Sequence, residues 1–305
     1  MTKIVFYGTG EFAATVLKAI ANDASYKILA VITSPDQPIG RKQEMQKSAV
    51  KTFAETLGVE ILQPASLKEF DAPILSEADL GVVAEYGFII PQRLLDLPKH
   101  KTVNLHGSIL PKLRGASPIQ TAIMNGETET GVTLMLMDAK MDHGPIIAMQ
   151  KLSILPDETQ KELFTRLAIV ASELFLRETP KYISGEIIPV EQNHDGATFC
   201  KIFTRDDGHV DFSQPAQNIY NQYRAMTPWP GLWTTFEGKR LKLSVITPAD
   251  PKNLSEGQIL AQNGHLYVGC GANSAIEAIE VQPEGKKPMD AKSFINGARN
   301  LTRFE

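Results

Sequence analysis

The sequence has few cysteines, no long apolar run and no excess of basic charge. Its 305 residues include only Cys200 and Cys270, and neither belongs to a C-x-x-C pair. This excludes a disulfide framework and a thiolate zinc site, and it fits a reducing compartment. The longest apolar stretch, 80–90, is interrupted by Glu85 and falls short of the roughly 18 residues of a membrane span. The apolar run before Gly8 is too short for a signal peptide, so we expect a soluble, cytoplasmic protein.

The charge balance is slightly acidic, with 31 Lys and Arg against 35 Asp and Glu and a formal net charge of −4. Residues 205–305 hold eleven charges of each sign. A broad electropositive coat for nucleic acid is therefore excluded, whereas a local basic contact is not. Apolar residues at 43% and charged residues at 22% are ordinary for a globular protein, and the length predicts two domains.

The first half alternates short apolar runs with amphipathic stretches. The expected strands are 3–7, 26–33, 80–84, 102–105, 131–137 and 145–152, and the expected helices are 11–21, 48–57 and 159–182. This order is typical of βαβ units, which build a mostly parallel sheet with helices on both faces. The nearly continuous apolar run 28–32 supports it, because parallel strands are covered on both sides. We predict an α/β fold for this half.

The character of the chain changes after Pro189. Short β-type runs follow at 234–236, 241–246, 259–260, 266–268 and 276–281. Glu237-Gly238 predicts a tight hairpin turn between the first two runs. Several short strands at this spacing indicate a small barrel or sandwich, with a boundary between about 190 and 207.

Gly8-Thr9-Gly10 follows the first expected strand and opens a helix, which is the position of a dinucleotide fingerprint. That fingerprint also needs an acidic residue at the end of the second strand. Here Asp36 lies beyond Pro35, in a loop. Because glycines in this turn serve strand-to-helix packing equally well, a Rossmann NAD(P) oxidoreductase is a distant alternative.

Two polar residues, Asn104 and His106, occur at the carboxyl end of an otherwise apolar strand. Strand alternation places them on one face, and ligands of open parallel sheets bind at this edge. An amide beside an imidazole can bind a carbonyl oxygen and accept a proton, as acyl transfer requires. Equally, both can be strand-end residues that bond to loop backbone.

The loop 138–145 supplies two carboxylates between two apolar strands, and it can lie beside the Asn104 end of the sheet. For Asp138 a loop or capping role is favoured, and Asp142 stays open between that role and orienting the imidazole. His143 follows Asp142 directly, but no H-x-x-x-H or H-x-H pattern accompanies it, so we expect no metal site.

These segments together resemble the folate-dependent formyltransferases. The central match is Asn104-x-His106-x-Ser108-x-Leu110-Pro111-x-x-Arg114-Gly115, followed by Asp142-x-Gly144. Further segments resemble the branch of this family that acts on methionyl-tRNA, namely 33–42, 63–64, 83–91 and 228–231. The resemblance covers nearly the whole chain.

The resemblance implies a Rossmann-like formyltransferase domain over 1–189, a linker over 190–206 and an OB-like β-barrel domain that binds tRNA over 207–305. The formyl donor would be 10-formyltetrahydrofolate. The acceptor would be the amino group of methionyl initiator tRNA, and the product would serve translation initiation. We expect a monomer without a metal ion and without a membrane partner.

Carried over residue by residue, the resemblance assigns Asn104 to the formyl oxygen, His106 to proton transfer and Asp142 to orienting the imidazole. The folate-binding positions would be Tyr86, Gly87, Phe88, Ile89, Ser108, Ile109, Leu110 and Pro111. The tRNA contacts would be Arg41, Lys42 and Lys47, with a basic part of the second domain at Lys239, Arg240 and Lys242.

Other functions remain to be separated from this one. A formyltransferase for an amino-sugar nucleotide would use the same Asn, His and Asp, but its small acceptor needs no arm such as 34–47. Glycinamide ribonucleotide formyltransferase would need no second domain. A non-catalytic RNA-binding module would leave Asn104, His106 and Asp142 replaceable.

Overall fold

The computed structural model describes residues 1–39 and 44–305, so Arg41 and Lys42, two predicted tRNA contacts, lie outside the described residues. The chain forms two compact units that are interleaved along the sequence. Unit 1 comprises Met1–Pro118, Glu129–Ser153 and Phe164–Cys200, and unit 2 comprises Ile119–Thr128, Ile154–Leu163 and Lys201–Glu305.

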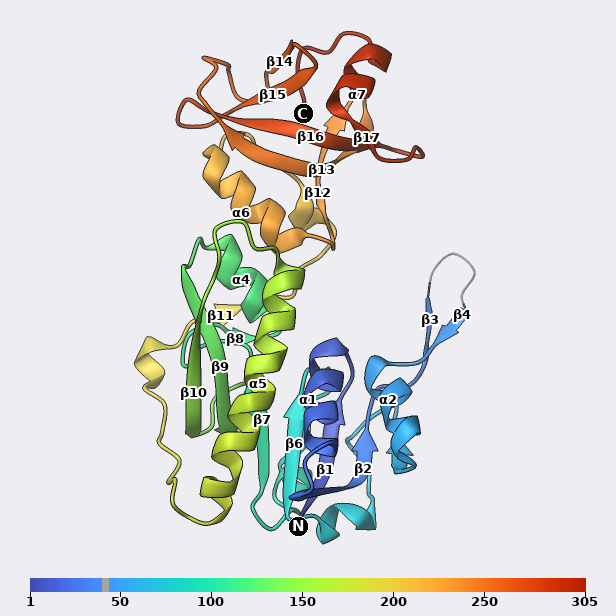
Figure 1. Cartoon of the computed structure of the whole chain (residues 1–305), viewed down its shortest axis with the longest axis vertical. Helices are drawn as coiled ribbons and strands as arrows, with labels where there is room; N and C mark the ends of the chain where they lie inside the picture. Colours follow the sequence, from blue (N-terminus) through green and yellow to red (C-terminus); the bar gives the residue numbers. More distant parts are fainter. Residues whose placement is uncertain (40–43) are drawn as a thin grey trace. The chain divides into compact units, whose positions relative to one another are not determined.

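Unit 1 contains a seven-stranded sheet with the order β10-β9-β7-β6-β1-β2-β5 (Figure 1). Its strands are β1 (Thr2–Gly8), β2 (Tyr26–Ile32), β5 (Glu60–Leu62), β6 (Leu80–Ala84), β7 (Thr102–His106), β9 (Glu129–Leu136) and β10 (Ile146–Ser153). The five strands from β7 to β5 are parallel, whereas β9 runs antiparallel to β7 and β10 antiparallel to β9. The predicted mostly parallel α/β sheet is confirmed.

Helices and loops cover both faces of this sheet. The helices of unit 1 are α1 (Glu11–Ala21), α2 (Ala49–Leu57), α3 (Gln92–Leu95) and most of α5 (Gln160–Ile183). α1 and α5 lie over the same face, where the rings of Phe12 and Phe164 meet edge to face at 5.7 Å (Figure 1). Val5 and Tyr7 of β1 point to the opposite face and pack with Leu75 and neighbouring apolar side chains. Full burial of one such side chain stabilises the fold by about 1.5–3 kcal/mol.

Local sequence explains where α2 begins and ends. The Ser48 hydroxyl accepts the amide hydrogen of Lys51 at 2.9 Å, which caps the first turn. Gly58 follows the helix at φ +65°, a left-handed conformation that glycine adopts without strain.

Four short strands lie outside the strands predicted from the sequence. β3 (Gln37–Ile39) and β4 (Glu44–Gln46) pair as an antiparallel hairpin, and β8 (Arg114–Gly115) pairs in parallel with β11 (Phe199–Cys200). Some connections contain short 3-10 helices, namely η1 (Pro73–Glu77), η2 (His194–Gly196) and η3 (Asp206–Gly208).

Unit 2 is built on an antiparallel sheet with the order β12-β13-β16-β15-β14, and β17 pairs with β16. The strands are β12 (Leu232–Phe236), β13 (Lys239–Ala249), β14 (Ile259–Gln262), β15 (His265–Cys270), β16 (Ser274–Pro283) and β17 (Met289–Asp290). The predicted turn joins β12 to β13 with Glu237 at φ +50° and Gly238 at φ +70°. The antiparallel second unit is thus confirmed, and its closure into a barrel stays a prediction.

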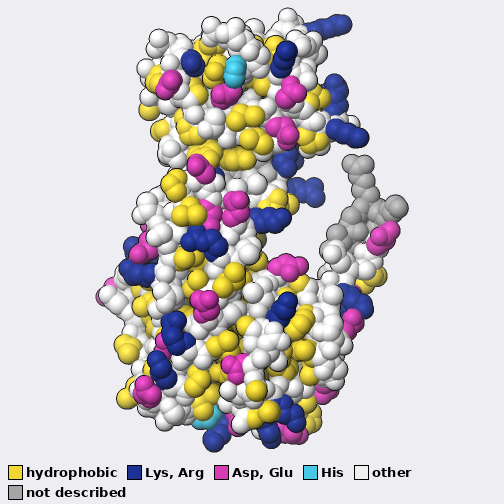
Figure 2. Space-filling view, viewed as in Figure 1, with side chains coloured by type: hydrophobic (Ala, Val, Ile, Leu, Met, Phe, Trp, Pro, Cys, Tyr) yellow, Lys and Arg dark blue, Asp and Glu magenta, His cyan; other side chains and the backbone are white. Residues whose placement is uncertain are grey.

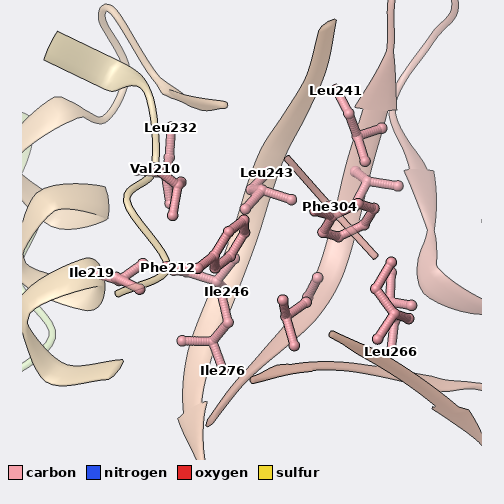
Figure 3. Packing of buried hydrophobic residues seen from close by; sticks show 14 of the residues in the cluster. Val210, Phe212, Ile219, Leu232, Leu241, Leu243, Ile246, Leu266, Ile276 and Phe304 are labelled. Carbon is pink, nitrogen blue, oxygen red and sulfur yellow. The ribbon is translucent and has the colours of Figure 1, made fainter. Parts of the chain in front are cut away.

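Three helices of unit 2 were not predicted: α4 (Pro118–Met124), whose residues from Ile119 lie in this unit, α6 (Ala216–Met226) and α7 (Ala291–Gly297). The core of the unit gathers side chains from the sheet, from α6 and from the chain end (Figure 3). Ile219 of α6, Leu243 of β13 and Phe304 near the C-terminus are each almost fully buried in it. In the described part of the chain, no helix is both long and apolar enough to cross a membrane.

Candidate active site

Asn104 and His106 lie at the carboxyl end of β7, between β6 and β9. In the sheet register Val83 of β6 is the partner of Asn104, and Thr133 of β9 is the partner of His106. The His106 side chain is buried, with 6% of the residue exposed, whereas Asn104 is half-buried. The alternation that the sequence predicts therefore places both side chains at one edge of the sheet.

Asp142, in the loop between β9 and β10, reaches the same place. Its Oδ1 lies 3.6 Å from Nδ1 of His106, and it accepts a long hydrogen bond of 3.5 Å from Nδ2 of Asn104. Its Oδ2 accepts the amide hydrogen of Gly115 at 2.8 Å. The structure thus brings together the three residues for which the sequence predicted a catalytic role.

The hydrogen-bond partner of Nε2 determines which ring nitrogen of His106 carries the hydrogen. Nε2 lies 2.9 Å from the carbonyl oxygen of Leu113. Because a carbonyl oxygen only accepts, Nε2 carries a hydrogen and donates it. In the neutral ring Nδ1 therefore keeps the lone pair, and it is Nδ1 that faces Asp142. A proton taken up by this imidazole is held at Nδ1, next to the carboxylate.

The predicted folate-binding segment 108–111 is fixed by hydrogen bonds within unit 1. The hydroxyl of Ser108 donates to the carbonyl oxygen of Lys112 at 2.6 Å. The hydroxyl of Thr133 donates to the carbonyl oxygen of Ser108 at 2.7 Å and accepts the amide hydrogen of Leu110 at 3.1 Å. Ile109 and Pro111 remain half-buried. The loop therefore has a defined conformation beside β9.

The second predicted folate segment, 86–89, follows β6 at the same edge of the sheet. The ring of Tyr86 contacts the rings of Tyr7 at 5.8 Å and Phe88 at 5.6 Å, both edge to face. Burial raises the pKa of Tyr86 to about 12. Its hydroxyl has no hydrogen-bond partner among the described residues. Gly87 is exposed and Ile89 is 85% exposed, so this segment offers an apolar surface next to β7.

Two side chains near Asp142 were not predicted to belong to the site. Arg114 stood inside the recognised motif without an assigned role, and it is buried. Gln192 lies in the predicted linker over 190–206, yet it is 5% exposed and bonds to the Asp142 loop. The sequence shows only that Gln192 follows the change in composition after Pro189, and this position does not predict a role in the site.

Asp138 and His143 form a separate pair in the same loop. His143 Nδ1 lies 2.7 Å from Asp138 Oδ2, and the His143 ring stacks on His194 with centroids 4.0 Å apart. No group of three or more potential metal ligands occurs in the described residues. The contacts of Asp138 and His143 link residues within this loop and join the loop to His194.

The carboxylate of Glu85 occupies the turn that Gly8 and Gly10 form after β1. Glu85 accepts the amide hydrogens of Phe12 at 3.0 Å and Ala13 at 3.3 Å, at the first turn of α1. A Cβ atom on Gly10 would collide with this carboxylate. In dinucleotide-binding proteins a phosphate binds at this helix end. Gly10 thus makes room for Glu85, whose carboxylate takes amide hydrogens that a phosphate would need, and this disfavours an NAD(P) site.

The segment before α2 is anchored at its base by Asp36. This carboxylate accepts hydrogen bonds from Lys51 Nζ at 2.8 Å and from Gln63 Nε2 at 2.8 Å. These two hydrogen bonds, that from Lys51 first, lower the pKa of Asp36. Lys47, the described member of the predicted tRNA contacts, is exposed and pairs with Glu55 at 2.8 Å, which raises the pKa of Lys47. A pair this exposed contributes little to stability because solvent screens it, so a phosphate can replace Glu55.

Unit 2 carries a hollow of about 360 Å³ whose walls include three basic side chains, two tryptophans and the acidic Glu284. Its lining includes Arg205, Trp229, Trp233, Arg240 and Lys242. The guanidinium of Arg240 lies 4.0 Å from the ring centroid of Trp233. Elsewhere basic and acidic side chains are interspersed on the visible face (Figure 2). Cations beside aromatic rings that solvent can reach are the groups that single-stranded nucleic acid binds.

Comparison with known proteins places the chain in a family. Residues 2–179 match the model of the formyl transferase family, and residues 202–299 match that of the formyl transferase C-terminal domain. The methionyl-tRNA formyltransferase of Myxococcus xanthus is 42% identical over 301 residues, covering 97% of this chain and 95% of its own. That of Listeria monocytogenes is 39% identical over 308 residues, covering 99% and 98%. The chain belongs to the methionyl-tRNA formyltransferase family.

Solved structures show that the fold of this family member is shared more widely. An N-formyltransferase from Helicobacter canadensis, in complex with folinic acid and dTDP-3-aminofucose, superposes with a TM-score of 0.68. It is 22% identical and covers 93% of this chain and all of its own. A 4-N formyltransferase from Francisella tularensis gives a TM-score of 0.63 at 19% identity and covers 78% and 95%. These likenesses confirm the Rossmann-like fold class.

Proposed function

We propose that this chain transfers the formyl group of 10-formyltetrahydrofolate to the amino group of methionyl initiator tRNA, forming N-formylmethionyl-tRNA for translation initiation. The observation that carries the proposal is the meeting of Asn104, His106 and Asp142 at the carboxyl end of β7. Relatives named for this activity are about 40% identical over nearly the whole chain, which supports the choice of acceptor. We expect the enzyme to act as a monomer in the cytoplasm.

Formyl transfer begins when the amine of the acceptor attacks the formyl carbon, so that a C–N bond forms and the carbonyl oxygen becomes an oxyanion. Nδ2 of Asn104 donates to this oxygen, and one such contact lowers the barrier by about 3 kcal/mol. Nδ1 of His106 accepts the proton that the amine loses. Asp142, 3.6 Å away, stabilises the imidazolium that results. The C–N10 bond then breaks, and the proton passes from His106 to N10 of tetrahydrofolate.

The formyl donor needs an apolar surface for its ring system and polar groups that hold the formyl end near Asn104. The segment 86–89 supplies the first through Tyr86, Phe88 and Ile89. Backbone groups of 108–111 supply the second, because that segment is fixed beside β9 by Thr133. Both segments flank the carboxyl end of β7, so the donor's reactive carbon is positioned between them.

The tRNA acceptor is held by few basic groups, which fits the net charge of −4. Lys47 next to the hairpin of β3 and β4 and the hollow with Arg240 and Lys242 are the described candidates. Arg41 and Lys42, outside the described residues, complete the proposed contacts. Because each phosphate contact adds to the salt dependence of binding, we expect a modest dependence of tRNA affinity on salt.

An amino-sugar nucleotide is the alternative acceptor, since the same three residues serve any amine. The hairpin of β3 and β4 favours tRNA, because an acceptor of nucleotide size needs no such arm. The experiment compares formyl transfer from 10-formyltetrahydrofolate to methionyl-tRNA, to a nucleotide amino-sugar and to glycinamide ribonucleotide. We expect only the tRNA to react, with a loss of at least ~10²-fold in His106→Ala. Equal turnover of the small acceptors would refute the proposal.

A further inference from the structure

Gln192 links the loop of Asp142 to a buried arginine. Its Nε2 donates to the carbonyl oxygen of Asp142 at 3.0 Å and to that of Gly144 at 2.8 Å. Its Oε1 accepts a hydrogen bond of 2.6 Å from the guanidinium of Arg114. All four residues belong to unit 1. The side-chain amide of Gln192 therefore donates both of its hydrogens to the loop of Asp142, and its oxygen accepts from Arg114.

The orientation of this amide follows from its partners alone. Arg114 can only donate, and the two carbonyl oxygens can only accept. The opposite orientation would place donor against donor and two acceptors against an acceptor. Since Gln192 and Arg114 are each at least 95% buried, water cannot compensate for such a mismatch, and the three bonds hold the loop in one position.

Asp142 needs this support because its backbone is strained. It has φ +46°, in the left-handed region, which costs a non-glycine residue of order 1 kcal/mol or more. Such a conformation persists only where neighbouring groups determine it. The side chain is fixed by the amide of Gly115 on one oxygen. The main chain is fixed at the carbonyl oxygen by Gln192.

We propose that Gln192, oriented by Arg114, is a positioning residue that keeps the Asp142 carboxylate aimed at His106 and Asn104. Its three hydrogen bonds go to Arg114 and to the carbonyl oxygens of Asp142 and Gly144, so it acts through the position of Asp142. This inference rests on the proposed function for its effect on rate. Its effect on the position of the carboxylate is a property of the fold and can be measured without any substrate.

The variant Gln192→Glu tests this role with the least change in shape. The new carboxylate can still accept from Arg114, but it presents an oxygen instead of two hydrogens to the carbonyls of Asp142 and Gly144. A misplacement of about 1 Å at a reacting group costs up to ~10²-fold in rate. We expect kcat to fall at least ~10-fold, with the KM for 10-formyltetrahydrofolate changing less than about twofold.

Gln222→Glu is a matched control, because Nε2 of Gln222 also donates to two backbone carbonyls, those of Asp207 and His209, at 2.9 Å each. Both belong to unit 2. We expect this variant to lose stability without losing turnover of the donor. If Gln192→Glu and Gln222→Glu lower kcat equally, Gln192 has a merely structural role and the inference is wrong.

A double-mutant cycle separates positioning from general damage. In an Asp142→Asn background, Gln192→Glu has no carboxylate to aim, so we expect less than about a twofold further loss in kcat. An undiminished loss in that background would overturn the inference. If the wild type formylates no acceptor, the proposed function fails instead, and the kinetic arms say nothing about Gln192.

A measurement without substrate tests the position of the Asp142 carboxylate directly. The amide hydrogen of Gly115 is bonded to Asp142 Oδ2, so its exchange with solvent reports whether the carboxylate is in place. By NMR we expect this exchange to be at least ~10-fold faster in Gln192→Glu and unchanged in Gln222→Glu. Unchanged exchange in Gln192→Glu would refute the positioning role, whatever the enzyme's substrate is.

Discussion

Replacing Asp142 with asparagine removes one charge and keeps the shape of the side chain. Gly115 donates to the carboxylate at 2.8 Å, so the asparagine oxygen takes that bond and the new amide group faces Nδ1 of His106. This amide donates to the Nδ1 lone pair and so favours the neutral ring. The substitution therefore opposes the protonation that catalysis requires, in addition to removing an attractive charge.

The distance sets the size of the effect. Unit charges 3.6 Å apart, as at Asp142 Oδ1 and His106 Nδ1, attract by about 1 kcal/mol in bulk water and about 5 kcal/mol at the effective dielectric of a protein site. The Asp142 side chain is 14% exposed, which places it between these limits. A loss of about 3 kcal/mol corresponds to ~10²-fold in rate.

The assay is single-turnover formyl transfer to methionyl-tRNA at saturating donor, so that binding and product release do not mask the chemical step. Asp138→Asn is the matched control, since Asp138 pairs with His143 at 2.7 Å in the same loop. We expect Asp142→Asn to lose ~10²-fold and Asp138→Asn less than about threefold. Activity within threefold of wild type in Asp142→Asn, or equal losses in the two variants, would refute the reasoning.

Three further predictions concern stability. Tyr86→Phe removes a buried hydroxyl without a described partner, so thermal denaturation should show a gain of about 1 kcal/mol; a raised KM for the donor would instead show that the hydroxyl binds ligand. Gly10→Ala should lower the Tm because its methyl group collides with the Glu85 carboxylate, and it should lower the Tm less in a Glu85→Ala background; an equal loss in both backgrounds would contradict the close contact. Hydrogen bonds, that of Lys51 foremost, lower the pKa of Asp36 in the folded state, so the ionised form stabilises the fold above the ordinary carboxyl pKa. This contribution is lost as the pH falls through the lowered pKa, and urea titrations should show the difference between wild type and Asp36→Asn vanishing there; a constant difference would exclude ionisation as its cause.

The site residues that could be predicted from the sequence are those whose positions are determined by a strand. Asn104 and His106 follow from strand alternation in an apolar strand, and their place at the sheet edge follows from the parallel order. Asp142 came from the resemblance, because no periodicity determines how a loop with φ +46° aims a side chain. Gln192 is 50 residues further along the chain and acts by contacts that only the folded structure creates.

Helix α6 shows a different limit of sequence analysis. Ala216, Ile219, Tyr220 and Tyr223 have helical spacing, but polar residues between them, such as Gln217, mask the apolar stripe. The β-type runs expected from the sequence begin only at 234, and no element is predicted over 216–226. In the folded chain burial in the core of unit 2 outweighs this weak local preference.

The interleaving of the two units limits how this protein can be cut and recombined. Unit 2 includes 154–163 as well as the region after 201, and the hydroxyl of Tyr220 donates to Asp157 at 3.0 Å. The guanidinium of Arg224 donates to the carbonyl oxygens of Leu155 at 3.4 Å and Glu158 at 3.3 Å. A fragment that begins at 201 leaves this buried cation without those acceptors. A chimera that exchanges the second unit between relatives must therefore replace three segments and be joined at five junctions along the chain, not one.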